Sequence, residues 1–342
     1  MPNMKDVARY AGVSVTTVSR VVNDYPHVDA GVRERVLNAA AVLGYRANAV
    51  ARSMRQGRTR SLGLIVRDMA STNFAAICAA AEAAAERRGY QLFVCNSNRD
   101  PKKERRYIEA LLNRRVDGLV IFTADDRVNN LDLTVGGPPV VLVESELSIA
   151  ADRVMSGGEE AAAQATRHLL GLGHRRIAFM AWGQGIHVGK GRLNGFMRAM
   201  AEAGIAPDVA LIRHCGVDPT RSEPETRFVL TLRPAPTALL ISATDLTPGA
   251  LSAIRELQIE VPRDLSVLAF DDREAASFFA PPITVMARNA ADLGSKAVEL
   301  LLDRIEGRLT QDEETRVVPF SLLVRGSTGP CRTSDVPAGG RS

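Results

Sequence analysis

The fold that this sequence predicts is an N-terminal three-helix helix-turn-helix head, a hinge helix, and an α/β body with two doubly wound parallel sheets. Three observations lead to it. The chain has 342 residues, more than one ordinary domain of about 100–200 residues. Short helical patterns with capping residues fill residues 4–45. From Ser61 onward, short apolar runs alternate with helical segments in two successive series, which is typical of parallel α/β folds.

The first two helices are marked by their ends. Asn3 is a good cap for a helix that begins at Met4, and Gly12 is suited to end it. Ser14 can cap a second helix. The apolar residues of that second helix recur at helical spacing: Val18, Val21 and Val22. Two short helices joined by a tight turn at Gly12 form a helix-turn-helix.

A third helix is expected after the loop at residues 23–30, and it extends to about Leu43. Gly44 and Tyr45 then close a three-helix bundle. The side chains expected to point inward are Val32, Val36, Leu37 and Ala40.

A short segment links the head to the body. Residues 48–56, NAVARSMRQ, are rich in arginine and poor in large apolar side chains, so a helix there is not stable alone. Residues 57–60 follow as a linker. The predicted domains are therefore a head at 1–47, a hinge helix and linker at 48–60, a body at 61–328 and a disordered tail at 329–342.

The body contains two series of buried strands. The first series comprises 61–66, 90–95, 116–122 and 139–144, with helices near 74–88 and 102–115. The second comprises 175–181, 209–213, 236–242 and 265–270, with helices near 191–203, 246–257 and 292–306. Each series predicts one lobe. Ligands of such folds bind at the carboxyl ends of the strands, and a pair of lobes binds them in the cleft between.

Charge is distributed unevenly along the chain. Residues 1–60 hold ten lysines and arginines against four acidic residues, whereas the remaining 282 residues hold 33 against 35. A basic head on a slightly acidic body indicates a polyanion as the partner of the head. The alternative is an ordinary solvated charged surface.

Location and redox chemistry are also constrained. No apolar run approaches the roughly 20 residues that span a bilayer, and the N-terminus lacks the apolar stretch of a signal peptide. The four cysteines lie far apart, without a CxxC pair, so neither a metal site nor a disulfide is expected. We expect a soluble cytoplasmic protein without a cofactor.

Several stretches resemble one family. MKDVARYAGVSVTTVSRVVN and RERVLNAAAVLGYRANAVARSM are similar to the start of lac repressor/gal repressor (LacI/GalR) family regulators, and RRVDGLVIF, HLLGLGHRRIAF, GRLNGF and LSVLAFDD are similar to phrases in their bodies. The resemblance covers about residues 3–325. It implies a transcriptional regulator, most often a repressor, that forms a homodimer on a palindromic DNA operator and binds a small-molecule effector between its lobes. No tetramerising heptads are visible near the C-terminus, so a dimer is expected.

The resemblance assigns base reading to Val15, Thr16 and Arg20 on the second helix. An arginine can bond guanine O6 and N7, while valine and threonine methyls can contact a thymine methyl. Ser14, Thr17 and Ser19 carry short hydroxyls suited to phosphate contacts. The remaining residues of the DNA-binding set are Asn23 and, in the hinge helix, Asn48, Ala51 and Met54. Met54 stands where the family usually has leucine, and an apolar side chain there can insert between base steps.

The resemblance also implies an effector site. It places an effector-binding arginine at Arg192, and acidic ligand-binding residues at Glu144 and Asp271. Asn73, Phe74 and Thr244 complete the expected set. An arginine beside carboxylates suits a polyhydroxylated or mixed-charge ligand, so we expect a carbohydrate or a sugar derivative. A salt bridge between the lobes is the alternative role for Arg192 and Glu144.

The chain departs from the family pattern at three places. Thr244 stands where an asparagine is frequent, Met155–Gly157 stands where Asp-Asn commonly follows the crossover between lobes, and no aromatic residue lies within 214–218. These departures leave the ligand's identity open.

Two other classes of protein share parts of this pattern. For an α/β enzyme, residues 183–191 look like a phosphate-binding loop, but the Walker spacing fails and no serine or threonine follows Lys190. No GxSxG or HExxH motif is present either. A periplasmic solute-binding protein shares the two-lobed body, but not the basic helical head. We therefore expect a regulator and no enzyme activity.

Overall fold

The structure is a computed structural model that describes residues 2–23, 25–45, 58–183, 187–216, 218–272 and 274–331. The chain divides into two compact units, Met1–Arg60 and Ser61–Ser342. The predicted hinge helix, with Asn48, Ala51 and Met54, lies outside the described residues. Among the residues described, no helix is long and apolar enough to cross a membrane.

The first unit contains three helices, α1 (Met4–Ala11), α2 (Val15–Val22) and α3 (Ala30–Val42). Asn3 caps α1 in a capping box with Asp6, and Gly12 ends it in the left-handed conformation at φ 66°. The buried core consists of Val7, Ala8, Val18, Val21, Val36 and Ala39. These caps and this core confirm the predicted three-helix head.

One predicted core residue of the head is wrong. Leu37 is 52% exposed, whereas Ala39 is buried. Val36 and Ala39 lie three positions apart and share the inward face of α3, and position 37 is rotated about 100° away from position 36 on a helix. The Leu37 side chain thus points to solvent, because only a narrow face of α3 packs against the core.

The first lobe of the second unit contains a six-stranded sheet in the order β11-β5-β4-β3-β1-β2. All pairs in it are parallel. Its strands are β1 (Ser61–Val66), β2 (Gln91–Asn96), β3 (Gly118–Ile121), β4 (Val140–Val143), β5 (Asp152–Met155) and β11 (Thr315–Val317). A short 3-10 helix, η1 (Leu131–Thr134), precedes β4.

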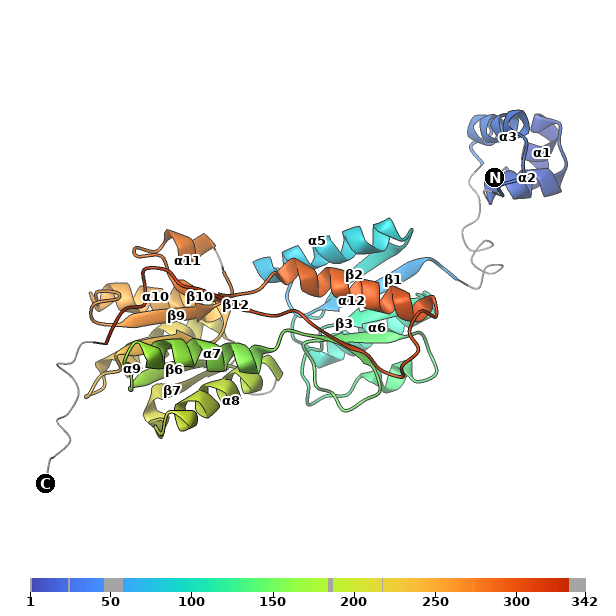
Figure 1. The fold of residues 1–342 in the computed structure, drawn as a ribbon. Coiled ribbons are helices and arrows are strands. Elements are labelled where there is room, and N and C mark those ends of the chain that lie inside the picture. Colours follow the sequence, from blue (N-terminus) through green and yellow to red (C-terminus); the bar gives the residue numbers. More distant parts are fainter. Residues whose placement is uncertain are drawn as a thin grey trace, which may run out of the picture. The chain divides into compact units, whose positions relative to one another are not determined.

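Helices cover both faces of this sheet. α5 (Thr72–Arg87) and α12 (Ala290–Ile305) pack on one face, and α6 (Pro101–Asn113) packs on the other. Figure 1 shows α12 lying alongside α5. The sequence predicted the helix near 292–306 as part of the second lobe, and this is wrong: Leu293 and Leu301 are buried in the first lobe's core. The helix follows second-lobe strands in sequence, but the chain has crossed back before it begins.

The second lobe repeats this architecture with a sheet in the order β12-β10-β9-β8-β6-β7. Only β12 runs antiparallel to its neighbour, β10, among the pairs described. Its strands are β6 (Ile177–Trp182), β7 (Ile212–Gly216), β8 (Ala238–Ile241), β9 (Ser266–Phe270), β10 (Thr284–Ala287) and β12 (Ser321–Leu323).

The helices of the second lobe again form two layers. α7 (Gly158–Gly171) and α8 (His187–Glu202) pack on one face, and α9 (Ser222–Thr231) and α10 (Thr247–Glu256) pack on the other. The short elements are η2 (Val209–Leu211), η3 (Pro219–Arg221), η4 (Thr244–Leu246) and α11 (Glu274–Phe278). Two mostly parallel sheets with helices on both faces confirm the predicted two-lobed body.

Several elements differ from the sequence prediction. The predicted strand 209–213 begins as the 3-10 helix η2, because the Asp208 side chain accepts a hydrogen bond from Ala210 N and turns the chain. The strands β5, β10, β11 and β12 and the helices α7 and α9 were not predicted. Each of these strands has only three or four residues, and α7 is alanine-rich with no strong amphipathic pattern.

The C-terminal segment is held longer than predicted. Gly329 O lies 3.0 Å from His174 Nε2, and Cys331 N donates to Leu172 O at 2.8 Å. The chain is therefore attached to the second lobe at least to Cys331, beyond the expected start of the tail at Gly329. Residues 332–342 lie outside the described part.

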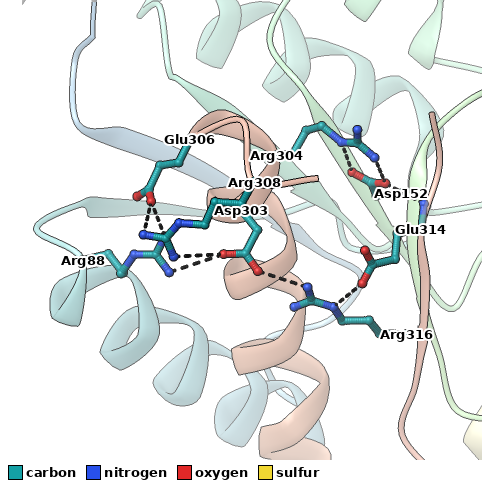
Figure 2. Close-up of polar contacts among 8 residues, drawn as sticks. All are labelled: Arg88, Asp152, Asp303, Arg304, Glu306, Arg308, Glu314 and Arg316. Atoms are coloured by element: carbon teal, nitrogen blue, oxygen red, sulfur yellow. Dashed lines mark hydrogen bonds and ion pairs between the residues drawn. The ribbon is translucent and has the colours of Figure 1, made fainter. Parts of the chain in front are cut away.

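An ion-pair network joins the end of α5, α12 and the neighbouring strands β5 and β11 of the first lobe (Figure 2). Arg304 donates to both Asp152 oxygens, at 2.9 and 2.7 Å. Asp303 lies within ion-pair distance of Arg88, Arg308 and Arg316. This network ties a helix encoded near residue 300 to strands encoded near residues 152 and 315.

Candidate DNA-reading helix and ligand cavity

The second helix of the head is fixed at its start by Ser14. The Ser14 hydroxyl accepts a hydrogen bond from Thr17 N at 3.1 Å and lies 2.8 Å from the Thr17 hydroxyl. This cap satisfies backbone donors that the first turn would otherwise leave free. Two of the predicted phosphate-contacting residues thus also set the start of α2.

The two faces of α2 are clearly different. Val18 and Val21 are buried in the head's core. Val15, Thr16 and Arg20 are exposed, and the Arg20 side chain has no hydrogen bond or ion pair with any residue that the structure describes. The three residues expected to read bases therefore lie on the outer face of a short rigid helix, with the arginine available to an external acceptor.

Ser19 and Asn23 lie at the other end of this helix. The Asn23 side chain donates to Ser19 O at 2.5 Å and to the Ser19 hydroxyl at 3.3 Å. In the unbound head, Asn23 therefore stabilises the end of α2.

All six residues expected to bind an effector line one cavity between the lobes of the second unit. They come from separate elements: Asn73 and Phe74 from α5, Glu144 after β4, Arg192 from α8, Thr244 from η4 and Asp271 after β9. The centre of a water molecule can occupy about 90 Å³ of it. The structure thus brings together residues separated by up to about 200 positions.

The two acidic residues have the same unusual backbone. Glu144 follows β4 with φ 54°, and Asp271 follows β9 with φ 62°. A left-handed conformation at a residue other than glycine costs on the order of 1 kcal/mol and tends to occur at functional sites. Both lobes use this conformation directly after a strand, where the side chain lines the cavity.

Asp271 is held by a chain of polar contacts. Thr244 Oγ1 donates to Asp271 Oδ2 at 2.7 Å, and Asn73 Nδ2 donates to Thr244 Oγ1 at 3.3 Å. Burial by itself raises the pKa of Asp271, but Arg288, Arg192 and the Thr244 hydroxyl outweigh it, and the pKa lies below its ordinary value. Asp271 is therefore ionised at neutral pH.

Arg288 was not predicted, yet it connects the two carboxylates. Its Nε lies 3.1 Å from Asp271 Oδ1, and its Nη1 lies 3.2 Å from Glu144 Oε2. Glu144 Oε2 also accepts a hydrogen bond from the Ser156 hydroxyl at 2.8 Å. The sequence signal for Arg288 was its position directly after the apolar run TVMA, at the carboxyl end of a strand. That signal was not used because the strand itself, β10, was not predicted.

Arg192 is almost fully buried, and its side chain donates to a single acceptor among the residues that the structure describes. Its Nη1 donates to Ser242 O at 2.5 Å, and its guanidinium lies 4.1 Å from the centre of the Phe270 ring. Burial lowers the pKa of Arg192 to about 10, so the side chain is still charged at neutral pH. The alternative role considered for Glu144, a salt bridge between the lobes, is observed, because Glu144 follows β4 of the first lobe and pairs with Arg288, which follows β10 of the second. For Arg192 no salt bridge is found with any residue that the structure describes.

The prediction missed other residues of the cavity, among them Arg67, Arg99 and Trp182. Arg67 directly follows β1, its burial lowers its pKa, and it donates to Thr123 O and Glu144 O. Trp182 ends β6 and lies under the guanidinium of Arg99 at 5.3 Å. Arg67 and Trp182 both stand at the carboxyl end of a predicted strand, so the rule that found Glu144 applied to them as well. An aromatic residue is thus present in the cavity, although not within 214–218.

The described residues contain no group of three or more histidine, cysteine, aspartate and glutamate side chains placed to hold a metal ion.

Two family profiles match the chain. Residues 3–48 match bacterial regulatory proteins of the lacI family, and residues 166–328 match a periplasmic binding protein-like domain. These ranges contain the helix-turn-helix head and most of the second lobe.

Named relatives span nearly the whole chain. The HTH-type transcriptional repressor PurR of Mannheimia succiniciproducens is 33% identical over 330 residues, which is 96% of this chain and 98% of the relative. PurR of Haemophilus influenzae strain PittEE is 34% identical over 307 residues, or 89% and 91% of the two chains. Both are transcriptional repressors and neither is described as an enzyme.

Solved structures agree in fold over the same length. A lac repressor dimer bound to operator and the anti-inducer ONPF has a TM-score of 0.86 and 28% identity, covering 96% of this chain and 99% of the other. A complex of the transcriptional regulator CelR with cellobiose has a TM-score of 0.73 and 28% identity, covering 96% and 100%.

Proposed function

This chain belongs to the lacI family of bacterial regulatory proteins and is a DNA-binding transcriptional repressor, and we propose that a carbohydrate or sugar-derived effector in its interlobe cavity controls its affinity for the operator. The single observation that carries this proposal is the convergence of six residues from both lobes on one cavity. The CelR relative was solved with cellobiose, which supports a sugar-like ligand here.

The proposal assigns the head to the operator. Val15, Thr16 and Arg20 read bases, while Ser14, Thr17, Ser19 and Asn23 contact the backbone. Asn48, Ala51 and Met54 form a hinge helix that folds only against DNA, since residues 48–56 cannot stabilise a helix alone. We include in the proposal the domain boundaries given above and a cytoplasmic location, where operator DNA is found.

We further propose a homodimer on a palindromic operator, because a two-fold dimer presents its two recognition helices to two inverted half-sites. The lac repressor relative was solved as a dimer on operator. Footprinting on genomic DNA tests this: two inverted half-sites are expected, and a lone asymmetric half-site contradicts it. A light-scattering mass of four chains contradicts the dimer.

Base reading by Arg20 has its own test. We expect Arg20→Ala to cost about 1–3 kcal/mol of discrimination at one base pair of each half-site, because an arginine fork on guanine is lost. Fluorescence anisotropy on operator variants measures this. Arg9→Ala, which changes an exposed arginine on α1, is the control and should not change which base is preferred. Unchanged base preference in Arg20→Ala refutes the assignment.

The effector's role is tested by a thermal-shift screen of sugars and organic acids, followed by anisotropy with and without each stabilising compound. A ligand that binds the two lobe arrangements differently must shift operator affinity. We expect Arg192→Ala to abolish that shift, and Arg105→Ala, on the exposed surface of α6, to retain it. A shift that persists in Arg192→Ala places the effector elsewhere.

A further inference from the structure

The described side chains that line the cavity carry an excess of positive charge. Four arginines line the cavity, Arg67, Arg99, Arg192 and Arg288, against the three carboxylates Glu144, Asp245 and Asp271. Arg288 pairs with both Glu144 and Asp271, and Arg99 lies 3.5 Å from Asp245. The three carboxylates are therefore all engaged by Arg288 and Arg99.

Arg192 has no carboxylate within ion-pair distance in the described part of the chain. Its Nε and Nη2 are buried and have no hydrogen-bond partner there. A buried charge without a partner is costly, and burial holds the pKa of this guanidinium well below its ordinary value. A structure that keeps such a group at the wall of a cavity is suited to bind the missing anion.

The free atoms of Arg192 also have a defined geometry. Nη1 is engaged by Ser242 O, and the Nε–H and Nη2–H bonds of a guanidinium point the same way along its other edge. That edge matches the two oxygens of a carboxylate in a bidentate pair. Stacking on Phe270, at 4.1 Å, and on Phe320, at 5.4 Å, fixes the plane of the fork.

Glu144 indicates a second group on the ligand. Its Oε2 bonds Ser156 and Arg288, whereas its Oε1 is buried without a partner in the described part of the chain. A carboxylate oxygen in that position requires a donor, and a hydroxyl supplies one. A matching ligand would thus present a pair of acceptor atoms to Arg192 and a hydrogen-bond donor to Glu144 on the same small molecule.

We propose that the effector is a hydroxylated carboxylic acid, such as a sugar acid, whose carboxylate pairs with Nε and Nη2 of Arg192 while a hydroxyl donates to Glu144 Oε1. This deepens the function proposed above and rests on it. Neutral sugars leave the Arg192 charge unmatched, and amino sugars add a second cation to a cavity that already has an excess of them.

The test uses the full-length protein and a matched library. Each aldose is compared with its aldonic acid, its uronic acid, its amino sugar and its phosphate ester by thermal shift and calorimetry. We expect the tightest ligand to be a carboxylic acid that binds about tenfold or more above its parent aldose, which corresponds to one charge-assisted bidentate contact. In Arg192→Gln that preference should disappear, whereas the surface variant Arg105→Gln should keep it.

Arg192→Lys tests the fork itself. It retains the charge but has no parallel pair of N–H donors, so it should still prefer acids while binding them about tenfold more weakly. Acid binding in Arg192→Lys as tight as in the wild type overturns the bidentate contact. Circular dichroism checks that both variants are folded.

Several outcomes overturn the carboxylate. One such outcome is that the ligand that binds most tightly and depends on Arg192 is a neutral sugar, an amino sugar or a sugar phosphate. Another is that no acid in the library binds through Arg192. Anisotropy on operator DNA in the same samples separates the two proposals. If the tightest Arg192-dependent ligand is a neutral sugar and it shifts operator affinity, the carboxylic-acid proposal is refuted, while control of the repressor by an effector is retained. If ligands bind but never shift operator affinity, effector control itself is refuted.

Discussion

Replacing Arg288 by methionine should destabilise the body strongly at neutral pH and much less in acid. Arg288 is 9% exposed, and its partners Glu144 and Asp271 are 5% and 8% exposed. Removing one partner of a buried ion pair costs about 3–5 kcal/mol, because a buried charge is left uncompensated. Each carboxylate retains one hydroxyl donor, Ser156 or Thr244, so we expect about 3 kcal/mol.

The pH dependence follows from Asp271. In the wild type the pKa of Asp271 is lowered from its ordinary value of 3.8. The ionised carboxylate therefore stabilises the fold fully at pH values above 3.8, and this stabilisation is lost as the pH falls through the lowered pKa. Without Arg288 the carboxyl can escape its penalty by taking up a proton. Keeping this carboxyl protonated costs about 1.4 kcal/mol for each pH unit above its ordinary pKa of 3.8, so protonation limits the loss of stability to about 4.4 kcal/mol at pH 7 and about 1.6 kcal/mol at pH 5.

Urea unfolding followed by Trp182 fluorescence measures this, because Trp182 is the chain's one tryptophan and is buried beside the cavity. Asp271→Asn/Arg288→Met should lose less stability than Arg288→Met, since one unpaired charge is gone. Arg105→Met, which breaks an exposed pair with Asp132, should cost about 0–1 kcal/mol. A loss below about 1 kcal/mol in Arg288→Met at neutral pH, or a loss that grows on acidification, refutes the reasoning.

Two further predictions concern the helix layers and the network of Figure 2. Gly294→Ala should lower the free energy of unfolding by about 1–3 kcal/mol, because the added Cβ would lie 2.1 Å from Ile77 O between α12 and α5. Gly171→Ala is the control: its Cβ would have no atom within 4 Å, so the change should be neutral or stabilise by up to about 1 kcal/mol. Circular dichroism during urea unfolding compares them, and equal stabilities would show that the helices can separate freely. Asp152→Asn should cost about 1.5–3 kcal/mol, since its carboxylate is 3% exposed and accepts two bonds from Arg304; a loss that vanishes in moderate salt would show that the pair behaves as a surface one.

The sequence determined what depends on neighbours a few positions apart. The caps Asn3 and Ser14 lie within three residues of the donors they satisfy, so the three-helix head could be predicted directly. The base-reading role of Val15, Thr16 and Arg20 came from the family resemblance and stays a prediction. Alternating apolar and helical segments fixed the two-lobed body. The resemblance and the position after strands together located the cavity residues Glu144 and Asp271.

Tertiary structure alone decided which elements share a lobe and which charges pair. The helix at Ala290–Ile305 is first-lobe structure because its apolar face is buried against α5, more than 200 positions earlier, and nothing local in either segment specifies that partner. Arg288 meets Glu144 across 144 positions. Ion pairing depends on distances of a few ångströms that the chain's crossings between lobes create. The sequence predicted an arginine among carboxylates, and the fold decided that Arg288 pairs with both carboxylates while Arg192 pairs with neither.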